Sequence, residues 1–178
     1  QTYYESVTHY KRIVNELPVR GIGFDFASNT ENLAQLKAEG FPENKVLIAG
    51  VVASRDPWKS DLIKTASLVN EIKQSLNNDN LILTSAGPLY HLPHTIEDEK
   101  DLDSDIRNLL SFANERLTEL AILQNYVNNN ENIPEDYQQP FKNLKPNSSV
   151  QDKISALNPK TINRPQPFAE RYEKQIES

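Results

Sequence analysis

The stretch LILTSAGPLYHLP, residues 81–93, decides the fold class that this sequence predicts. It begins with the apolar run Leu81-Ile82-Leu83, which is typical of a strand buried on both faces of a sheet. The run then breaks at Gly87-Pro88 into a loop that carries His91. Many α/β enzymes place their functional groups in such loops, just beyond the carboxyl ends of parallel strands. The stretch therefore predicts an α/β protein with a candidate site in this loop.

Two more apolar runs, each followed by a helical pattern, precede this strand. We expect strands at 19–26 (VRGIGFDF) and 45–53 (KVLIAGVVA), and helices at 5–17, 30–39 and 59–76. Helices that alternate with such apolar strands predict a parallel sheet with right-handed crossovers. The chain opens on QTYY, which resembles the end of a strand that leads into a helix, and it contains no methionine. We therefore expect a fragment cut within a βα unit.

A longer amphipathic helix is expected after the candidate loop, from the acidic segment 97–105 to about Val127. Its apolar positions recur at helical spacing. They are Ile106, Leu109, Leu110, Ala113, Leu117, Leu120 and Ala121. The region from residue 131 onward holds six of the 11 prolines, with short helices expected at 150–157 and 167–176. We predict an α/β domain at 1–130 and an extended, partly helical tail at 131–178.

Composition excludes several functional classes. The net charge of −6 argues against non-specific nucleic-acid binding, which needs a basic surface. No apolar run approaches the roughly 20 residues that span a bilayer, and no secretory signal is visible. The absence of cysteine excludes disulfides, thiolate metal sites and cysteine nucleophiles. These features favour a cytoplasmic protein with no membrane or nucleic-acid partner.

Polar residues at the ends of the first two strands are candidate site residues. Asp25 is either a general base or substrate acceptor, or a helix cap or a partner of Arg20 or Arg55. Arg55 is placed either to bind an anion or to pair with an aspartate. Trp58 either packs against a planar ligand or covers the rim of the sheet. Strand-end residues take either kind of role in α/β proteins.

Two histidines follow the third strand. The H-x-x-H spacing of His91 and His94 suits metal binding on a helix, but Pro93 lies between them and no third ligand cluster is evident. We therefore predict no metal site here and expect two loop histidines with ordinary hydrogen bonds. Gly21 and Gly23 lie within a strand, so they do not form a phosphate-binding fingerprint. The pair Tyr3-Tyr4 is interpreted as packing.

Five motifs in succession resemble one family. They are QTYY, LPVRGIGFDF, FPENKVLIAGVVASRDPW, SAGPLYHLP and LLSFANERLTEL, and the closing NRPQPFAERYEKQ agrees as well. In order and spacing they are similar to the N-terminal domain of the cobalamin-independent methionine synthases. Within the loops, the family pattern is kept at Arg55, Trp58, Ser85, His91 and Pro93. We predict five substrate-binding residues at a barrel rim. They are Asp25, Arg55, Trp58, Ser85 and His91.

The resemblance implies a fold and an activity. The family has two (βα)8 TIM-type barrels, and this chain corresponds to about strands five to eight of the first barrel, followed by a Pro-rich helical tail. The family transfers a methyl group from 5-methyltetrahydrofolate polyglutamate to homocysteine to make methionine. Its zinc ligands, which are histidine, glutamate and two cysteines, belong to the second, C-terminal barrel. This chain therefore carries no catalytic residue and no cofactor of its own.

Two functional hypotheses follow. In the first, the chain is a scaffold and cleft wall of a zinc-dependent methyltransferase, inactive alone, whose partner is the C-terminal barrel of the same polypeptide. In the second, it is a non-catalytic structural or binding module derived from that barrel. Half a barrel also leaves exposed sheet edges, through which two copies can self-associate.

Overall fold

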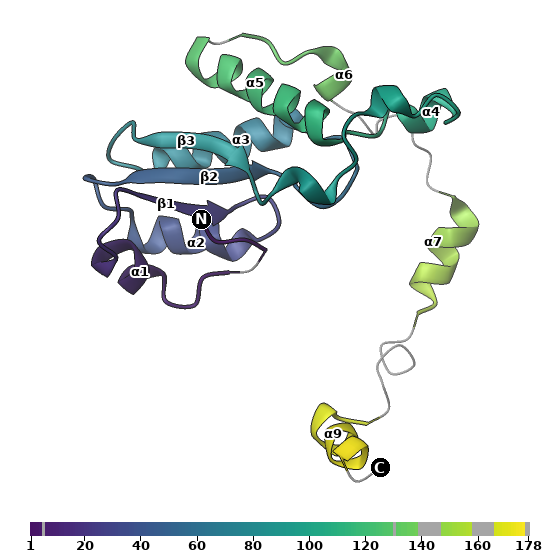
Figure 1. The fold of residues 1–178 in the computed structure, drawn as a ribbon, viewed down its shortest axis with the longest axis horizontal. Coiled ribbons are helices and arrows are strands. Elements are labelled where there is room, and N and C mark those ends of the chain that lie inside the picture. The colour runs from purple at the N-terminus through teal and green to yellow at the C-terminus, as the bar shows by residue number, and fades with distance from the viewer. Residues whose placement is uncertain (5, 130, 139–146, 158–165, 177–178) are drawn as a thin grey trace. The chain divides into compact units, whose positions relative to one another are not determined.

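The computed structural model describes residues 1–4, 6–129, 131–138, 147–157 and 166–176. The chain divides into two compact units, residues 1–142 and 143–178, which are taken separately below (Figure 1). The boundary predicted at residue 130 stays a prediction. Within the described residues, no helix is long and apolar enough to cross a membrane.

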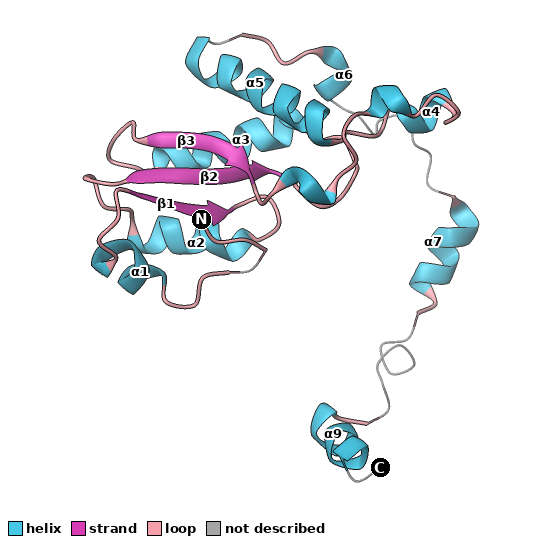
Figure 2. Ribbon diagram, in the orientation of Figure 1, coloured by secondary structure: helices cyan, strands magenta, loops and turns pink. Residues whose placement is uncertain are grey.

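The first unit is built on a parallel three-stranded sheet (Figure 2). The strands β1 (Gly21–Asp25), β2 (Val46–Val52) and β3 (Leu81–Ser85) lie side by side in chain order. The helices α2 (Thr30–Glu39) and α3 (Leu62–Gln74) form the crossovers. The predicted α/β class and parallel sheet are confirmed. The helix predicted at 30–39 is found with the same bounds.

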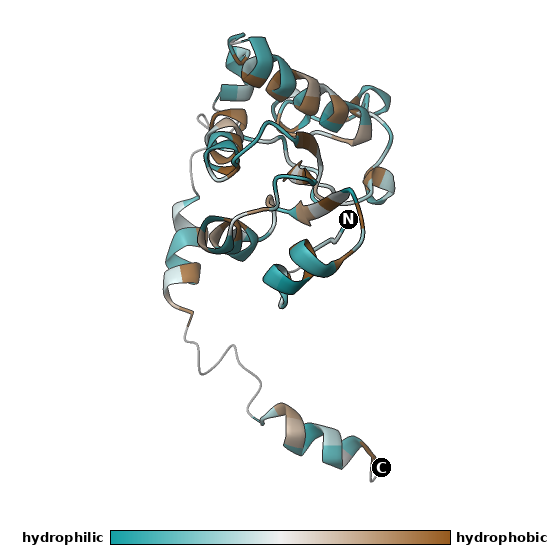
Figure 3. Cartoon of the chain, turned by 90° about the vertical axis from the view of Figure 1, so that its left-hand side faces the viewer, coloured by the Kyte–Doolittle hydropathy of each residue, from teal (hydrophilic) through white to brown (hydrophobic). Residues whose placement is uncertain are grey.

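One face of the sheet forms the core. Phe24, Leu47 and Ala49 are fully buried, and they lie on the helix-covered face together with Ile22. Since side chains alternate along a strand, the register places Gly23, Ile48 and Ile82 together on the opposite face. The apolar strands at the centre of the first unit contrast with the mixed colours of its helices in Figure 3.

The prediction that residues 81–83 are buried on both faces of the sheet is wrong for the described chain. Ile82 is 52% exposed, and the flanking residues of β3 are only half-buried. The reason is that β3 is an edge strand, which has no strand partner on its outer side among the described residues. A groove of about 540 Å³ runs along this edge, lined by parts of β3, α3 and α5 (Ala113–Asn129).

The first four residues lie along the other edge of the sheet. Thr2 donates its backbone N–H to the carbonyl oxygen of Gly23 at 2.9 Å. Gln1 reaches across the open face and donates its side-chain amide to the carbonyl oxygen of Ser85 at 3.1 Å. QTYY is not a strand in the described structure, but it occupies the place beside β1 where a preceding strand would pair.

The long helix predicted from 97–105 to Val127 is divided in two. A short helix, α4 (Ser104–Arg107), is followed by an extended segment before α5 begins at Ala113. In that segment Leu110 forms an isolated bridge with Trp58, and Ser111 donates its N–H to the carbonyl oxygen of Pro57 at 2.8 Å. These pairings use backbone groups that a continuous helix would need for itself.

Part of the apolar stripe predicted for this helix lines the groove, although Leu120 also packs against the core. Leu117 is 56% exposed and, with Leu120 and Ala121, lines the groove beside β3. The buried positions of α5 are Arg116, Glu119 and Leu123. The core-facing side of α5 therefore carries an ion pair, which an apolar periodicity does not reveal.

The start of α5 is held by the carboxylate of Glu115. It accepts hydrogen bonds from the hydroxyl of Thr95 at 2.7 Å and from the backbone N–H groups of Ile96 at 3.2 Å and Phe112 at 3.0 Å. Burial acts to raise the pKa of Glu115, but these hydrogen bonds outweigh burial and lower the pKa below its ordinary value. Glu115 thus fastens the loop after β3 to the following helix.

This geometry predicts a pH dependence of stability. Because the folded-state pKa of Glu115 is depressed, its stabilising effect is present above pH 4.5 and is lost as the pH falls through the folded-state pKa. We expect the melting temperature of Glu115→Gln to fall less steeply below pH 4.5 than that of the wild type, and to start from a lower value at pH 7. Thermal melts over a pH series measure this. Parallel curves for the two proteins would contradict it.

The first helix, α1 (Tyr10–Glu16), is shorter than the 5–17 predicted, and a buried lysine caps its carboxyl end. The ammonium group of Lys45, which is 7% exposed, donates to the carbonyl oxygens of Val14 and Leu17, both at 2.7 Å. A cation is favoured there because the carbonyl groups at a helix end lack backbone partners.

Lys45→Met is expected to lower the free energy of unfolding by about 1–3 kcal/mol, because it removes two charge-assisted hydrogen bonds to carbonyl groups. Urea denaturation measures the loss. The control is Lys37→Met, which removes an exposed ion pair with Glu71 and is expected to cost less than about 1 kcal/mol. Equal effects of the two variants would refute the capping role.

The second unit contains two described helices. These are α7 (Ser148–Ser155) and α9 (Phe168–Ile176), close to the helices predicted at 150–157 and 167–176. Asn147 caps α7 by accepting the backbone N–H of Ser149 at 3.0 Å. Of the six prolines from residue 131 onward, Pro140, Pro146, Pro159 and Pro165 lie outside the described residues. The extended, Pro-rich character of the tail stays a prediction.

Candidate functional site

The carboxyl ends of the three strands form a rim that gathers most of the predicted site residues. Asp25 ends β1, Arg55 follows β2, and Ser85 ends β3, with His91 in the short 3₁₀ helix of residues 89–91 beyond it. Parallel strands place their carboxyl ends at the same edge, so residues 30 positions apart in the chain become neighbours. Tyr4, which was interpreted as packing, contacts Asp25, Arg55 and His91.

Asp25 is completely buried, and its carboxylate accepts backbone hydrogen bonds. The donors are the N–H groups of Tyr4 at 3.2 Å and Ser28 at 2.8 Å. The carbonyl oxygen of Asp25 accepts from the side-chain amide of Asn32 at 2.8 Å. Within the described residues Asp25 makes no ion pair with Arg20 or Arg55. Its contacts are those of a turn cap that fixes the first residues of the chain to the rim.

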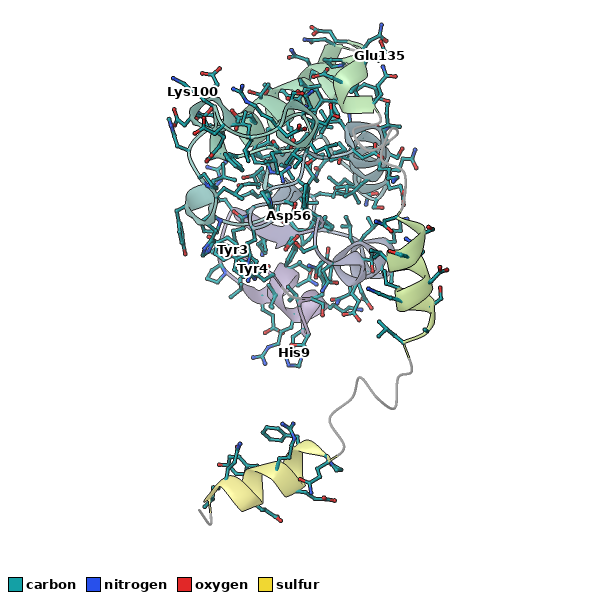
Figure 4. The ribbon with its side chains drawn as sticks, turned by 90° about the vertical axis from the view of Figure 1, so that its right-hand side faces the viewer. Tyr3, Tyr4, His9, Asp56, Lys100 and Glu135 are labelled. Atoms are coloured by element: carbon teal, nitrogen blue, oxygen red, sulfur yellow. The ribbon has the colours of Figure 1, made fainter. Side chains whose placement is uncertain are left out.

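Arg55 lies over an aromatic ring. Its guanidinium carbon is 4.5 Å from the centroid of the Tyr4 ring, a cation–π distance. His91 approaches the same ring edge-on, with the centroids 6.3 Å apart, and its ring is tilted against that of Tyr90, with the centroids 4.1 Å apart. Tyr3 and Tyr4, labelled in Figure 4, lie together at this end of the first unit, with their centroids 5.8 Å apart. We call Tyr4, Asp25, Arg55 and His91 the rim cluster.

Two predicted residues take structural contacts of their own. The hydroxyl of Ser85 donates to the carbonyl oxygen of Gly87 at 2.8 Å, which closes the turn after β3. Trp58 is 49% exposed, and its backbone pairs with Leu110. Among the described residues, neither forms a hydrogen bond or a ring contact with the rim cluster. His94 is exposed, and its carbonyl oxygen accepts the N–H of Asn114 at 3.0 Å.

A buried ion pair, which the sequence did not predict, contacts the loop after β2. Arg116 and Glu119, both fully buried, are joined at 2.8 Å. Glu119 also accepts from the backbone N–H of Ser60 at 3.0 Å and from its hydroxyl at 2.7 Å. Arg116 donates to the carbonyl oxygen of Asp56 at 2.9 Å and to that of Trp58. The pair thus fixes the loop after β2, which carries Arg55 and Trp58, to α5.

The residues of this chain do not fit the zinc site that the family resemblance implies. Two of the four implied ligands are cysteines, and the sequence has none. Among the described residues, no three histidine, aspartate or glutamate side chains come together in a metal-binding group. A zinc ion of that kind would therefore need ligands from outside these 178 residues.

Comparison with known proteins decides the relationship. Residues 1–77 match the family model described as "Cobalamin-independent synthase, N-terminal domain". A 5-methyltetrahydropteroyltriglutamate–homocysteine methyltransferase of Thermodesulfovibrio yellowstonii is 41% identical over 179 aligned residues, which cover 100% of this chain and 24% of that protein. The chain belongs to the cobalamin-independent synthase family. The predicted resemblance is thereby confirmed.

Other relatives agree with this family membership. The enzymes of the same name from Thermotoga petrophila and Bacillus subtilis are 39% and 36% identical, over 96% and 100% of this chain. They are matched over 22% and 24% of their own lengths. The chain thus spans about a quarter of the length of the curated relatives that it matches.

Proposed function

We propose that this chain serves as part of the N-terminal domain of a methyltransferase that moves a methyl group from 5-methyltetrahydropteroyltriglutamate to homocysteine. The observation that carries the proposal is the 41% identity to a methyltransferase of that name, which extends over the whole chain. Within such an enzyme, the chain is a scaffold and one wall of the cleft that receives the substrates. The C-terminal barrel of the same polypeptide is its partner and holds the zinc.

The open face of the sheet supports a partial (βα)8 barrel, corresponding to about strands five to eight. Gly21, Gly23 and Gly50 share that face with the aliphatic side chains of Ile48 and Ile82. Small and branched side chains of this kind fill the interior of a closed barrel. In a complete barrel, further strands would cover the edge of β3 and the groove beside it.

The rim cluster gives the chain a role at the cleft. The resemblance implies that the substrate-facing end of the barrel is the carboxyl end of its strands, where the rim cluster lies. Arg55 and His91 are exposed there, whereas Asp25 is buried and holds the backbone in place. In this proposal Arg55, Trp58, Ser85 and His91 shape the wall of the cleft, with Asp25 as their support. None of them carries out a chemical step.

The isolated chain tests the scaffold assignment. Supplied with zinc, homocysteine and 5-methyltetrahydropteroyltriglutamate, the 178-residue chain is expected to form no methionine. Metal analysis after dialysis should find much less than one zinc per chain, since the cysteine ligands are missing. Methionine formation or stoichiometric zinc in the isolated chain would refute this assignment.

The alternative is a non-catalytic module derived from the same barrel. The sequence of the rest of the gene distinguishes the two hypotheses. A downstream barrel with a histidine and two cysteines at zinc-ligand spacing favours the methyltransferase, and its absence favours the module.

We also propose that the isolated chain associates with itself through the open edge of β3. Unpaired strand edges bind one another readily, and the exposed side chains of Ile82 and Leu117 line this edge. Light scattering is expected to give a mass above the 20.3 kDa of a single chain, and Ile82→Lys is expected to restore 20.3 kDa. Ile63→Lys, on the exposed side of α3, is the control. A monomeric wild-type chain would exclude this association.

A further inference from the structure

Tyr4 has an unusual backbone conformation. Its φ of +71° is the sole positive value at a non-glycine residue in the described part of the chain. Aromatic side chains rarely adopt this left-handed region, and such strain persists only where the surroundings impose it. Two hydrogen bonds impose this conformation here. The N–H of Tyr4 donates to the buried carboxylate of Asp25, and the N–H of Thr2 donates to the carbonyl oxygen of Gly23.

The strained backbone places the Tyr4 ring in a close-fitting slot. The phenol oxygen is buried and has no hydrogen-bond partner among the described residues. The wall of the slot is Gly87, where an added Cβ would lie 3.2 Å from that oxygen and 2.8 Å from the hydroxyl of Ser54. The buried phenol hydroxyl adds no stabilising hydrogen bond among the described residues, so the slot acts on the ring itself and fixes its plane.

The fixed ring holds the guanidinium of Arg55, and the charge of Arg55 is not otherwise used. The guanidinium lies 4.5 Å from the ring centroid, and in the part of the chain that the structure describes no hydrogen bond or ion pair engages it. The nearby carboxylates are occupied, since Asp25 accepts two N–H groups and Asp56 pairs with Arg116 at 3.3 Å. A stacked guanidinium keeps its N–H donors free at its edge.

We propose that Tyr4 is a positioning residue that holds Arg55 to bind an oxyanion, a carboxylate or a phosphate, at the rim. The planar fork of an arginine matches both anions with two parallel hydrogen bonds. His91, edge-on to the same ring, completes one side of the site. This proposal rests on the proposed function in one respect only, namely that the rim faces a ligand.

The test is the Nε–H signal of Arg55 in the ¹⁵N-labelled chain, titrated with glutarate and with inorganic phosphate. In the wild type and in Tyr4→Phe, the signal should be shifted by the ring current and should move on titration. In Tyr4→Leu the ring-current shift should vanish, and the apparent Kd should rise about two- to fivefold. A response to glutarate identifies a carboxylate ligand, and one to phosphate identifies a phosphate ester.

Arg55→Lys is a second test variant, which keeps the proposal testable if Tyr4→Leu does not fold. Arg55 is exposed, so the substitution leaves the core unchanged, and loss of the bidentate geometry should weaken anion binding about fivefold or more. Equal affinity in Arg55→Lys, or in a folded Tyr4→Leu, would overturn the proposal, as would an Arg55 signal that neither anion moves. The proposed methyltransferase function is tested separately, by methionine formation. Its failure would leave the results of these titrations unchanged.

Discussion

Arg116→Met is expected to lower the free energy of unfolding by about 3–5 kcal/mol, because it leaves the carboxylate of Glu119 buried without its cation. Both side chains are fully buried, so water cannot replace the lost partner. The loss also frees the loop at Asp56 and Trp58, whose carbonyl oxygens Arg116 engages.

Urea denaturation, followed by the fluorescence of Trp58, measures this loss. The double variant Arg116→Met, Glu119→Leu removes both charges and is expected to recover much of the stability, because a buried pair is often replaceable by apolar groups. Arg12→Ala breaks an exposed ion pair with Glu16 and is expected to cost less than about 1 kcal/mol. If Arg116→Met costs no more than Arg12→Ala, the buried pair does not hold the loop.

Gly50→Ala is expected to cost about 3 kcal/mol, near the upper end of the usual range for overpacking. The new Cβ would lie 2.7 Å from the Cα of Ala86 and 3.1 Å from the carbonyl oxygen of Phe24. These are backbone atoms of the neighbouring chain segments, so no side chain can rotate away. Gly50 pairs with Asp25 on one side and Thr84 on the other, and relief of the clash would disturb all three strands.

Gly21→Ala is the matched control for Gly50→Ala. It lies on the same face of the sheet, and its nearest neighbour would be a flexible Ile48 side chain at 3.4 Å. We expect its free energy of unfolding to stay within about 1 kcal/mol of the wild type. Equal losses of unfolding free energy in the two variants would show that the close backbone contacts at Gly50 do not cause the loss.

Local patterns in the sequence predicted the alternating elements of the first unit well. The helix at 30–39 is correct at both ends because Asn29 caps it by accepting the N–H of Glu31 and Gly40 ends it at a φ of +71°. The strand predicted at 45–53 was confirmed as Val46–Val52, since a run of buried aliphatic residues fits few other structures. Where a local signal fixes an element, sequence reasoning is sufficient.

The helix after β3 shows where local patterns fail. Its interruption depends on pairing of Leu110 with Trp58, residues that are 52 positions apart, and no local pattern reports such a contact. The buried positions of α5 include the charged Arg116 and Glu119 as well as Leu123, so an apolar stripe could predict only part of its buried side. The Glu115 side chain that accepts the N–H of Phe112 resembles a capping box, and this signal could have located the start of α5.

The candidate site was predicted in part. The positions of Asp25 and Arg55 at strand ends follow from the alternation of strands and helices alone. Tyr4 was missed because its role rests on a positive φ and on contacts with residues up to 87 positions along the chain, neither of which the sequence displays. The charges of Arg116 and Glu119 at i, i+3 gave no sign of burial, because exposed helices carry the same spacing.

The most direct test of the account is the rate of methionine formation by the protein encoded by the intact gene. With zinc, homocysteine and 5-methyltetrahydropteroyltriglutamate, the wild-type protein is expected to form methionine, and the Arg55→Ala variant should need a higher concentration of the folate. The 178-residue chain alone should form none. Absence of methionine formation by the intact protein under these conditions would contradict the account.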